Sequence, residues 1–217
     1  TQRAAPATAG ARLQFVHAGQ GHAGTRLGPE LGFAEGMHAY YGGSAGKAAV
    51  LKYAVGATSL GNFQNSTSDE FGTWMSPSMI EEYGEENLCL NAGLLYENLL
   101  VTVRMGLQAM IEAGYEPVIR GVMWMQGEAD STNQALAYDY QKHLTAFIND
   151  LRGDLTELMT ALDITQDCSA TPFVIGKIGA DLQNAAYEDV VREQMQMAAA
   201  AMTNVRCAET EDLLVPD

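Results

Sequence analysis

Residues 117–130, PVIRGVMWMQGEAD, contain the part of the sequence that decides the fold. The segment from Pro117 to Met125 is apolar and predicts a buried strand. Directly after it come Gln126 and the sequence Gly-Glu-Ala-Asp, which place an amide, a glycine and two carboxylates at the end of that strand. A turn that only connects two elements needs no more than Gly, Asn or Asp. This composition therefore indicates a candidate site for chemistry at the strand end, although a polar turn with an Asp or Ser helix cap fits the same residues.

Strand-like and helix-like segments alternate on both sides of this stretch. Further strands are predicted at 49–55, 171–178 and 205–210, and helices at 31–41, 92–113, 131–151 and 185–202. The connections are long enough for crossovers, so the pattern predicts an α/β fold with a parallel sheet and helices on both faces. Residues 62–87 are polar and predict a long surface excursion. A length of 217 residues fits a single domain, residues 1–217.

The charge balance argues against two classes of partner. Twelve Lys and Arg against 27 Asp and Glu leave a formal charge of −15, and a domain this acidic repels nucleic-acid phosphates and anionic lipid. No stretch approaches the roughly 20 continuous apolar residues that a membrane helix needs. The first residues have no hydrophobic signal core. We therefore expect no nucleic acid and no membrane as partner, and any export signal to have been removed or never to have existed.

The cysteines and histidines predict no metal site. No two of the cysteines lie at CxxC spacing, and the histidines His17, His22, His38 and His143 show no HExxH or comparable pattern. Cys168 and Cys207 fall near the starts of two predicted neighbouring strands, whereas Cys89 lies elsewhere. The pair is expected either to form a disulfide or to remain as buried free thiols.

Candidate site residues follow the predicted strands, because ligands of open α/β sheets bind beyond the carboxyl ends of the strands. Gly56 ends the strand at 49–55, and its backbone N–H can face a ligand with no side chain in the way. The NH₂ group of Gln126 can point at a developing oxyanion, with Glu128 and Asp130 fixing its orientation. An ordinary tight turn at Gly56 is the alternative.

Beyond the last predicted strand lie two more acids, Asp212 and Asp217, either of which can orient a histidine. Acids in the loops of an acidic protein are usually solvated. These two positions alone therefore carry little weight.

Three blocks resemble one known family. The blocks are GPELGFA at 28–34, KYAVGATSL at 52–60 and GVMWMQGEAD at 121–130. In this order they resemble successive blocks of the sialate O-acetylesterase-like carbohydrate esterases, which belong to the SGNH hydrolase superfamily, and the resemblance extends through Glu211–Leu213. It implies a three-layer α/β/α sandwich with a parallel, flavodoxin-like sheet. One departure is Ala57, where the family usually has a second glycine.

The resemblance also implies roles for individual residues. Gly56 resembles the glycine whose N–H donates to the oxyanion, and Gln126 resembles the side-chain donor. Glu128 and Asp130 resemble acids that brace the turn, and Asp217 resembles the aspartate of a closing Asp-x-x-His motif. The implied reaction is hydrolysis of acetyl esters through a serine acyl-enzyme. The acetylated sugar is sialic acid or a xylan-type glycan. The reaction needs no cofactor or metal, and the family suggests a secreted enzyme acting on polysaccharide.

Two further departures concern the catalytic groups. The family carries its nucleophilic serine in a Gly-Gln-Ser-Asn block, whereas residues 19–22 match only the first two letters and Gly21 has no hydroxyl. The family's histidine would stand three positions beyond Asp217, where the sequence ends. We therefore expect an SGNH-type domain without its first strand and last helix, in which the nucleophile and base are not among the 217 residues.

Other functional readings stay open at this point. Trp74 and Ser59 are candidate sugar contacts, as is the loop with His17 and His22, although a buried Trp74 covering the core is an alternative. Residues 42–46, GGSAG, match the GxSxG nucleophile elbow, but a helix-like run precedes them and a strand-like run follows, the reverse of what the elbow needs. A non-catalytic carbohydrate-binding or interaction module that keeps the fold is the main alternative to an enzyme.

Overall fold

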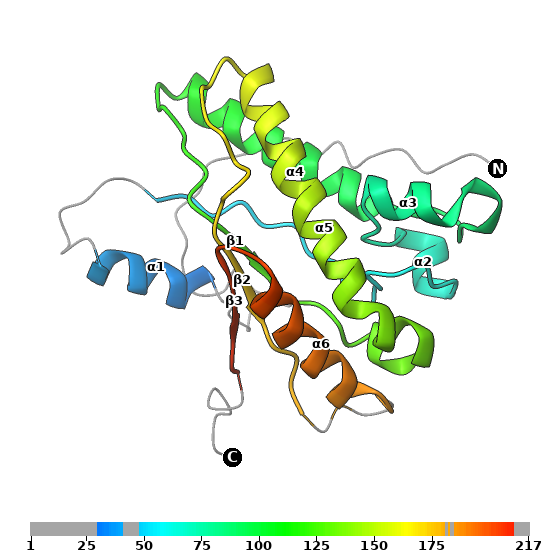
Figure 1. The fold of residues 1–217 in the computed structure, drawn as a ribbon. Helices are drawn as coiled ribbons and strands as arrows, with labels where there is room; N and C mark the ends of the chain where they lie inside the picture. Colours follow the sequence, from blue (N-terminus) through cyan, green and yellow to red (C-terminus); the bar gives the residue numbers. More distant parts are fainter. Residues whose placement is uncertain (1–29, 41–47, 181, 183–184, 211–217) are drawn as a thin grey trace.

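The computed structural model describes residues 30–40, 48–180, 182 and 185–210 (Figure 1). The α-helices are α1 (Glu30–Tyr40), α2 (Ser66–Phe71), α3 (Pro77–Tyr83), α4 (Leu94–Glu112), α5 (Gln134–Ala161) and α6 (Glu188–Ala201). Short 3₁₀ turns are η2 (Glu85–Asn87) and η3 (Asp130–Thr132). The strands are β1 (Val122–Trp124), β2 (Phe173–Gly176) and β3 (Val205–Ala208).

The strands form a parallel sheet in the order β1-β2-β3 within the described residues. Val122 lies beside Phe173, which in turn lies beside Val205 on the next strand. Helix α5 connects β1 to β2, and α6 connects β2 to β3. Parallel neighbours need such crossover connections. The predicted α/β class with a parallel sheet is therefore confirmed.

The two faces of the sheet differ in what covers them. In Figure 1, α5 and α6 lie together on one side of the strands and α1 lies on the other. Trp124, Phe173 and Ile175 point to the side of α5 and α6 and are buried, whereas Met123 and Val174 point the other way and are 49% and 39% exposed. Helices stand on both sides of the sheet, which is consistent with the expected SGNH-like α/β/α arrangement.

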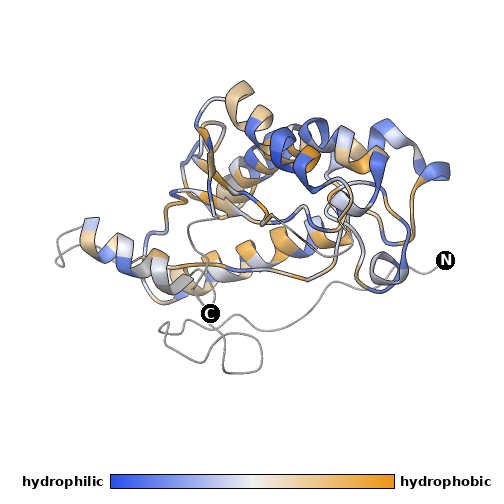
Figure 2. Cartoon of the chain, turned by 90° about the horizontal axis from the view of Figure 1, so that it is seen from below, coloured by the Kyte–Doolittle hydropathy of each residue, from blue (hydrophilic) through white to orange (hydrophobic). Residues whose placement is uncertain are grey.

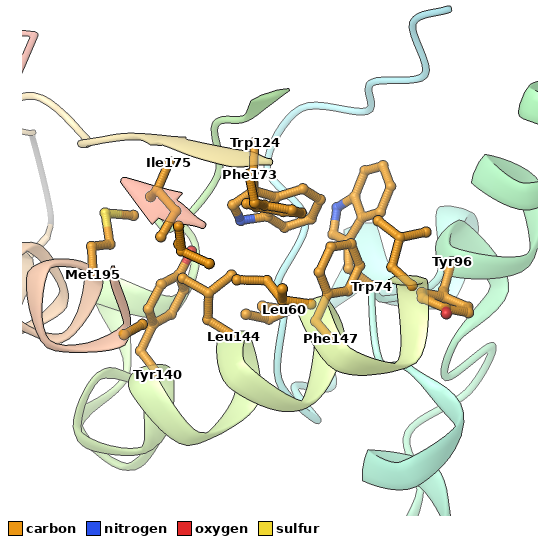
Figure 3. Packing of buried hydrophobic residues seen from close by; sticks show 14 of the residues in the cluster. Leu60, Trp74, Tyr96, Trp124, Tyr140, Leu144, Phe147, Phe173, Ile175 and Met195 are labelled. Carbon is orange, nitrogen blue, oxygen red and sulfur yellow. The ribbon is translucent and has the colours of Figure 1, made fainter. Parts of the chain in front are cut away.

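Aromatic side chains of β1, β2 and α5 make the centre of the core. Figure 3 shows Tyr140, Leu144 and Phe147 rising from α5 toward the strands. The ring of Phe147 lies 4.3 Å from that of Trp124 and 6.5 Å from that of Phe173. Figure 2 shows hydrophobic and hydrophilic residues alternating along the helices, as expected of helices with one buried side. This packing holds the carboxyl ends of the strands in place.

The strand predicted at 49–55 does not form, because this segment pairs with no described strand. Residues 48–55 are extended, but they join no ladder with a described strand. Leu51, Tyr53 and Val55 alternate toward the core and are only partly buried. The segment has the period of a strand, but a strand also requires a hydrogen-bonded neighbour, and within the described sheet β1 pairs with β2 alone.

The predicted surface excursion at 62–87 is also wrong, because the segment folds into α2 and α3. Asn65 caps α2 in a reciprocal capping box with Ser68. Met75 and Met79 are buried and form a second small core with Cys89. A few apolar side chains spaced among polar ones were enough to bury one side of these short helices.

Helix α5 begins later and ends later than predicted. Asn133 caps it by accepting a hydrogen bond from the N–H of Leu136 at 3.2 Å, while the hydroxyl of Ser131, at the start of the predicted helix, donates to the carbonyl of Glu128 at 2.7 Å. The helix extends to Ala161 because its apolar stripe continues to Met159.

The cysteines of the described residues are free thiols. Cys207 lies in β3 beside Ile175, whereas Cys168 precedes the amino end of β2. This register separates the two sulfurs, so the disulfide alternative is wrong. None of the helices in the described part of the chain is both long enough and apolar enough to span a membrane.

Candidate active site

Two segments far apart in the sequence meet beyond the carboxyl end of β1. They are the turn at 126–130 and the segment 56–61, which follows the extended residues 48–55. The side-chain Nε2 of Gln126 donates to the carbonyl of Thr58 at 2.9 Å and to Oδ2 of Asp130 at 2.5 Å. Both hydrogens of the amide therefore have protein acceptors, and Gln126 is only 7% exposed.

Asp130 joins the two segments through its carboxylate. Oδ2 accepts the N–H of Leu60 at 2.9 Å, and Oδ1 accepts the N–H of Gly61 at 3.0 Å. The side chain is fully buried. Burial raises the pKa of Asp130 to about 6, although the hydrogen bonds from Leu60, Gln126 and Gly61 act in the opposite direction. A carboxylate with several N–H donors is satisfied in the interior only while it can accept from all of them.

Tyr140 of α5 contacts the other end of the Gln126 side chain. Its hydroxyl lies 2.7 Å from the main-chain oxygen of Gln126 and 3.0 Å from Oε1. The ring is fully buried, and burial raises the pKa of Tyr140 well above its ordinary value. The hydroxyl is therefore a permanent donor at neutral pH.

Two backbone positions shape these segments. Gly127 has φ +144°, and a Cβ there would lie 2.7 Å from Cε of Met195 and 3.0 Å from Cγ1 of Val191. Only glycine lets the turn approach α6 so closely. Ala57 has φ +59°, in the left-handed region that favours glycine. The structure thus explains in physical terms the glycine expected at position 57, and it places an alanine there in a strained conformation.

The structure separates the predicted site residues into two groups. Gly56 is exposed, and a Cβ added to it would have no atom within 4 Å. Within the described part of the chain, the N–H of Gly56 has no acceptor. Gln126 and Asp130 are joined to the segment that begins at Gly56. Glu128 is exposed, and within the same part of the chain its carboxylate binds no other residue, so bracing of the turn falls to Asp130 rather than to Glu128.

The prediction that Trp74 and Ser59 contact sugar is wrong. Trp74 is 4% exposed, and its Nε1 donates to Oγ1 of Thr58 at 2.8 Å. Its ring packs edge-on against Trp124 at 5.3 Å. Ser59 is 1% exposed and its hydroxyl donates to the carbonyl of Gly61 at 3.0 Å. Both side chains fix the segment from the inside, because the polar residues around them supply acceptors within the core.

Several predicted positions lie outside the described residues. These are Asp212, Asp217, His17, His22, the sequence at 19–22 and the GGSAG stretch at 42–46. Among the residues that are described, no serine or cysteine is hydrogen-bonded to a histidine, and no three His, Cys, Asp or Glu side chains are grouped as metal ligands would be.

Sequence reasoning missed Thr58 and Tyr140. Thr58 acts through its main-chain carbonyl, which carries no signal in the sequence. Tyr140 falls on the buried stripe of α5, and a buried tyrosine needs a partner for its hydroxyl. That requirement was a usable signal, but it does not identify the partner.

Comparisons with known proteins give one family. A family model described as carbohydrate esterase, sialic acid-specific acetylesterase, matches residues 9–217. No curated protein matches the chain. Among solved structures, a protein from Arabidopsis thaliana is 23% identical, with a TM-score of 0.43, and the match covers 63% of this chain and 46% of the plant protein. The chain therefore spans less than half of that protein's length.

Proposed function

Because the chain belongs to the sialic acid-specific acetylesterase family of carbohydrate esterases, we propose that it is a carbohydrate O-acetylesterase. In this proposal its substrates are acetyl esters of sugars, and the sugar is sialic acid or a xylan-type glycan. The proposal includes action outside the cell, with which the charge of −15 is compatible.

The observation that carries the proposal is the junction of the segments 56–61 and 126–130. Acyl transfer passes through a tetrahedral intermediate whose oxyanion needs preorganised N–H donors. Gly56 is exposed two residues before Thr58, its N–H has no acceptor among the described residues, and Thr58 is bound directly by Gln126. Asp130 locks the same segment through the N–H groups of Leu60 and Gly61. A free backbone donor therefore stands next to a rigid, buried support.

Gln126 must change one partner to act as a second donor. Its amide hydrogens bind the neutral carbonyl of Thr58 and the carboxyl group of Asp130. Hydrogen bonds to a charged acceptor are roughly twice as strong as those between neutral groups. We infer that Gln126 keeps Asp130 and gives up Thr58 when negative charge develops on the substrate oxygen.

The nucleophile and the base come from outside the described residues in this proposal. A serine hydroxyl loses its proton to a histidine and attacks the acetyl carbonyl, the sugar oxygen leaves with a proton, and water then releases acetate from the acetyl-enzyme. Asp217 is the residue proposed to orient the histidine.

Acetate release by a protein that includes the nucleophilic serine and the histidine base together with these 217 residues tests the proposal. O-acetylated sialic acid and acetylated xylan oligosaccharides are the substrates, and the deacetylated sugars are the blanks. If the chain is active, Gln126→Ala is expected to lower kcat by about 10²- to 10³-fold with little change in KM, because one oxyanion donor is lost. Gln166→Ala is the matched control, since the side-chain amide of Gln166 is also hydrogen-bonded to main chain, through two bonds to Ile119 on the amino side of β1.

The outcomes separate the alternatives. An unchanged kcat in Gln126→Ala would show that this amide is not a donor. Sugar binding in calorimetry without acetate release would favour the non-catalytic carbohydrate-binding module. Neither binding nor release from any of these sugars would overturn both readings.

A further inference from the structure

The acceptor end of the Gln126 side chain is held by one group, the Tyr140 hydroxyl. A primary amide can turn by 180° and exchange its oxygen with its NH₂ group at almost no change in shape. Thr58 and Asp130 offer oxygen atoms, which require the NH₂ end. At the opposite end, the Tyr140 hydroxyl lies 3.0 Å from Oε1 and 2.7 Å from the main-chain oxygen of the same residue. Thr58 and Asp130 therefore require the NH₂ group on their side, and this orientation lets the Tyr140 hydroxyl donate to Oε1 on the other side.

We infer that Tyr140 is a positioning residue, which fixes the Gln126 amide with its NH₂ group toward the segment 56–61. The inference rests on the proposed function only where it concerns catalysis. Tyr140 does not touch the reacting atoms in this arrangement, and it acts through Gln126.

The location of Tyr140 suits this role. Its ring is fully buried, and Figure 3 shows it rising from α5 with its hydroxyl oxygen toward the strands, between Leu144 and Met195. The surrounding core leaves the ring no alternative position, since close-packed side chains do not move independently. The single hydrogen of this hydroxyl is shared between the main-chain oxygen of Gln126 and Oε1 in a three-centre hydrogen bond, which restrains both the main chain and the side chain.

The same contact has a consequence for the change of partner proposed above. When the amide releases the Thr58 carbonyl, Oε1 must keep a donor, because a buried oxygen without one is destabilised. Tyr140 supplies that donor throughout. Removal of the hydroxyl would leave Oε1 without a donor among its present contacts and allow the amide to adopt more than one orientation.

The test compares Tyr140→Phe with Tyr96→Phe in the full chain. Tyr96 is also a buried tyrosine, and its hydroxyl donates to Oδ2 of Asp154 at 2.5 Å, away from Gln126. In ¹⁵N-labelled protein the side-chain amide of Gln126 is assigned by its disappearance in Gln126→Ala, and its hydrogen exchange is then measured. We expect Tyr140→Phe to speed that exchange by roughly tenfold or more, as loss of one buried hydrogen bond implies, and Tyr96→Phe to leave it unchanged.

Kinetics supply a second readout if the chain hydrolyses acetyl esters. Tyr140→Phe is then expected to lower kcat by roughly tenfold at unchanged KM, with no such effect in Tyr96→Phe. If wild-type protein releases no acetate, the proposed function fails while the exchange measurement still tests the positioning role. Equal exchange of the Gln126 amide in wild type and Tyr140→Phe would overturn the inference.

A measurement on the wild-type protein covers the case in which Tyr140→Phe does not fold. A nuclear Overhauser effect is expected between the side-chain NH₂ of Gln126 and the main-chain N–H of Leu60, because both donate to Oδ2 of Asp130. Its absence, or an effect to the ring protons of Tyr140 in its place, would turn the NH₂ group away from the segment 56–61 and overturn the inference.

Discussion

Replacement of Asp130 by asparagine should remove one specific component of the pH dependence of stability. The folded protein holds this carboxyl with a pKa of about 6, against an ordinary value of 3.8. Between these values the folded state binds a proton that the unfolded chain has released. The contribution of Asp130 to stability is therefore fully present below pH 3.8 and is lost as the pH rises through 6.

The size of the effect follows from the two pKa values. At pH 5 protonation favours the folded state about tenfold, which corresponds to about 1.4 kcal/mol, and at pH 8 the contribution is gone. Asp130→Asn abolishes it. The asparagine also replaces one of the two carboxylate oxygens with an NH₂ group, which then faces the N–H donor of either Leu60 or Gly61 and lowers stability by about 1–3 kcal/mol at every pH.

Urea unfolding of wild type and Asp130→Asn from pH 5 to pH 8 measures the difference. The stability advantage of the wild type should shrink by about 1.4 kcal/mol across this range.

A second titrating group does not disturb this comparison. Burial lowers the pKa of His143, so that the contribution of His143 to stability has the opposite sign and is lost as the pH falls below 6.5. That contribution is common to both proteins and cancels in the difference. Asp163→Asn, at an exposed aspartate just beyond α5, controls for the loss of one negative charge. A difference that stays flat, or grows toward pH 8, would refute the description of Asp130 as a desolvated carboxyl.

Two further predictions concern the backbone of the same segments. Ala57→Gly should raise the free energy of unfolding by about 0.5–1 kcal/mol, because φ +59° strains alanine by more than glycine loses in chain entropy; a decrease in urea unfolding would contradict the strain. Gly127→Ala should lower it by about 2–3 kcal/mol, because the new Cβ would lie 2.7 Å from Met195 and 3.0 Å from Val191 at a positive φ. Thermal and urea unfolding measure this loss, and unchanged stability would show that α6 can move away from the turn.

The helices and strands were largely predictable because their signals are local. The helix predicted at 31–41 is observed at Glu30–Tyr40, and the one predicted at 92–113 at Leu94–Glu112. The three strands lie inside the predicted apolar runs but are shorter. An apolar run shows which residues are buried, but a ladder ends where the neighbouring strand ends, and that depends on another part of the chain.

The candidate site was predictable in its location and not in its contacts. The nearness of Gln126 and Asp130 to the segment after Gly56 was predicted from the common edge at which parallel strands end, and it is observed although residues 48–55 pair with no described strand. Burial of Trp74 could not, since a lone tryptophan in a polar stretch fits an exposed and a buried position equally well. Its burial results from packing against Trp124 and a hydrogen bond to Thr58.

The order of helices and strands, and the turn chemistry at Gln126, follow from residues that are neighbours in the chain, because periodicity and turn preferences act over a few positions. The partners of that amide do not. Gln126 binds Thr58, 68 positions earlier, and Tyr140, 14 positions later, and Asp130 binds Leu60 across 70 positions. The packing of α5 and of the segment 56–61 around the same core brings these groups together, and hydrogen-bond geometry then selects the orientation in which the amide donors meet acceptors.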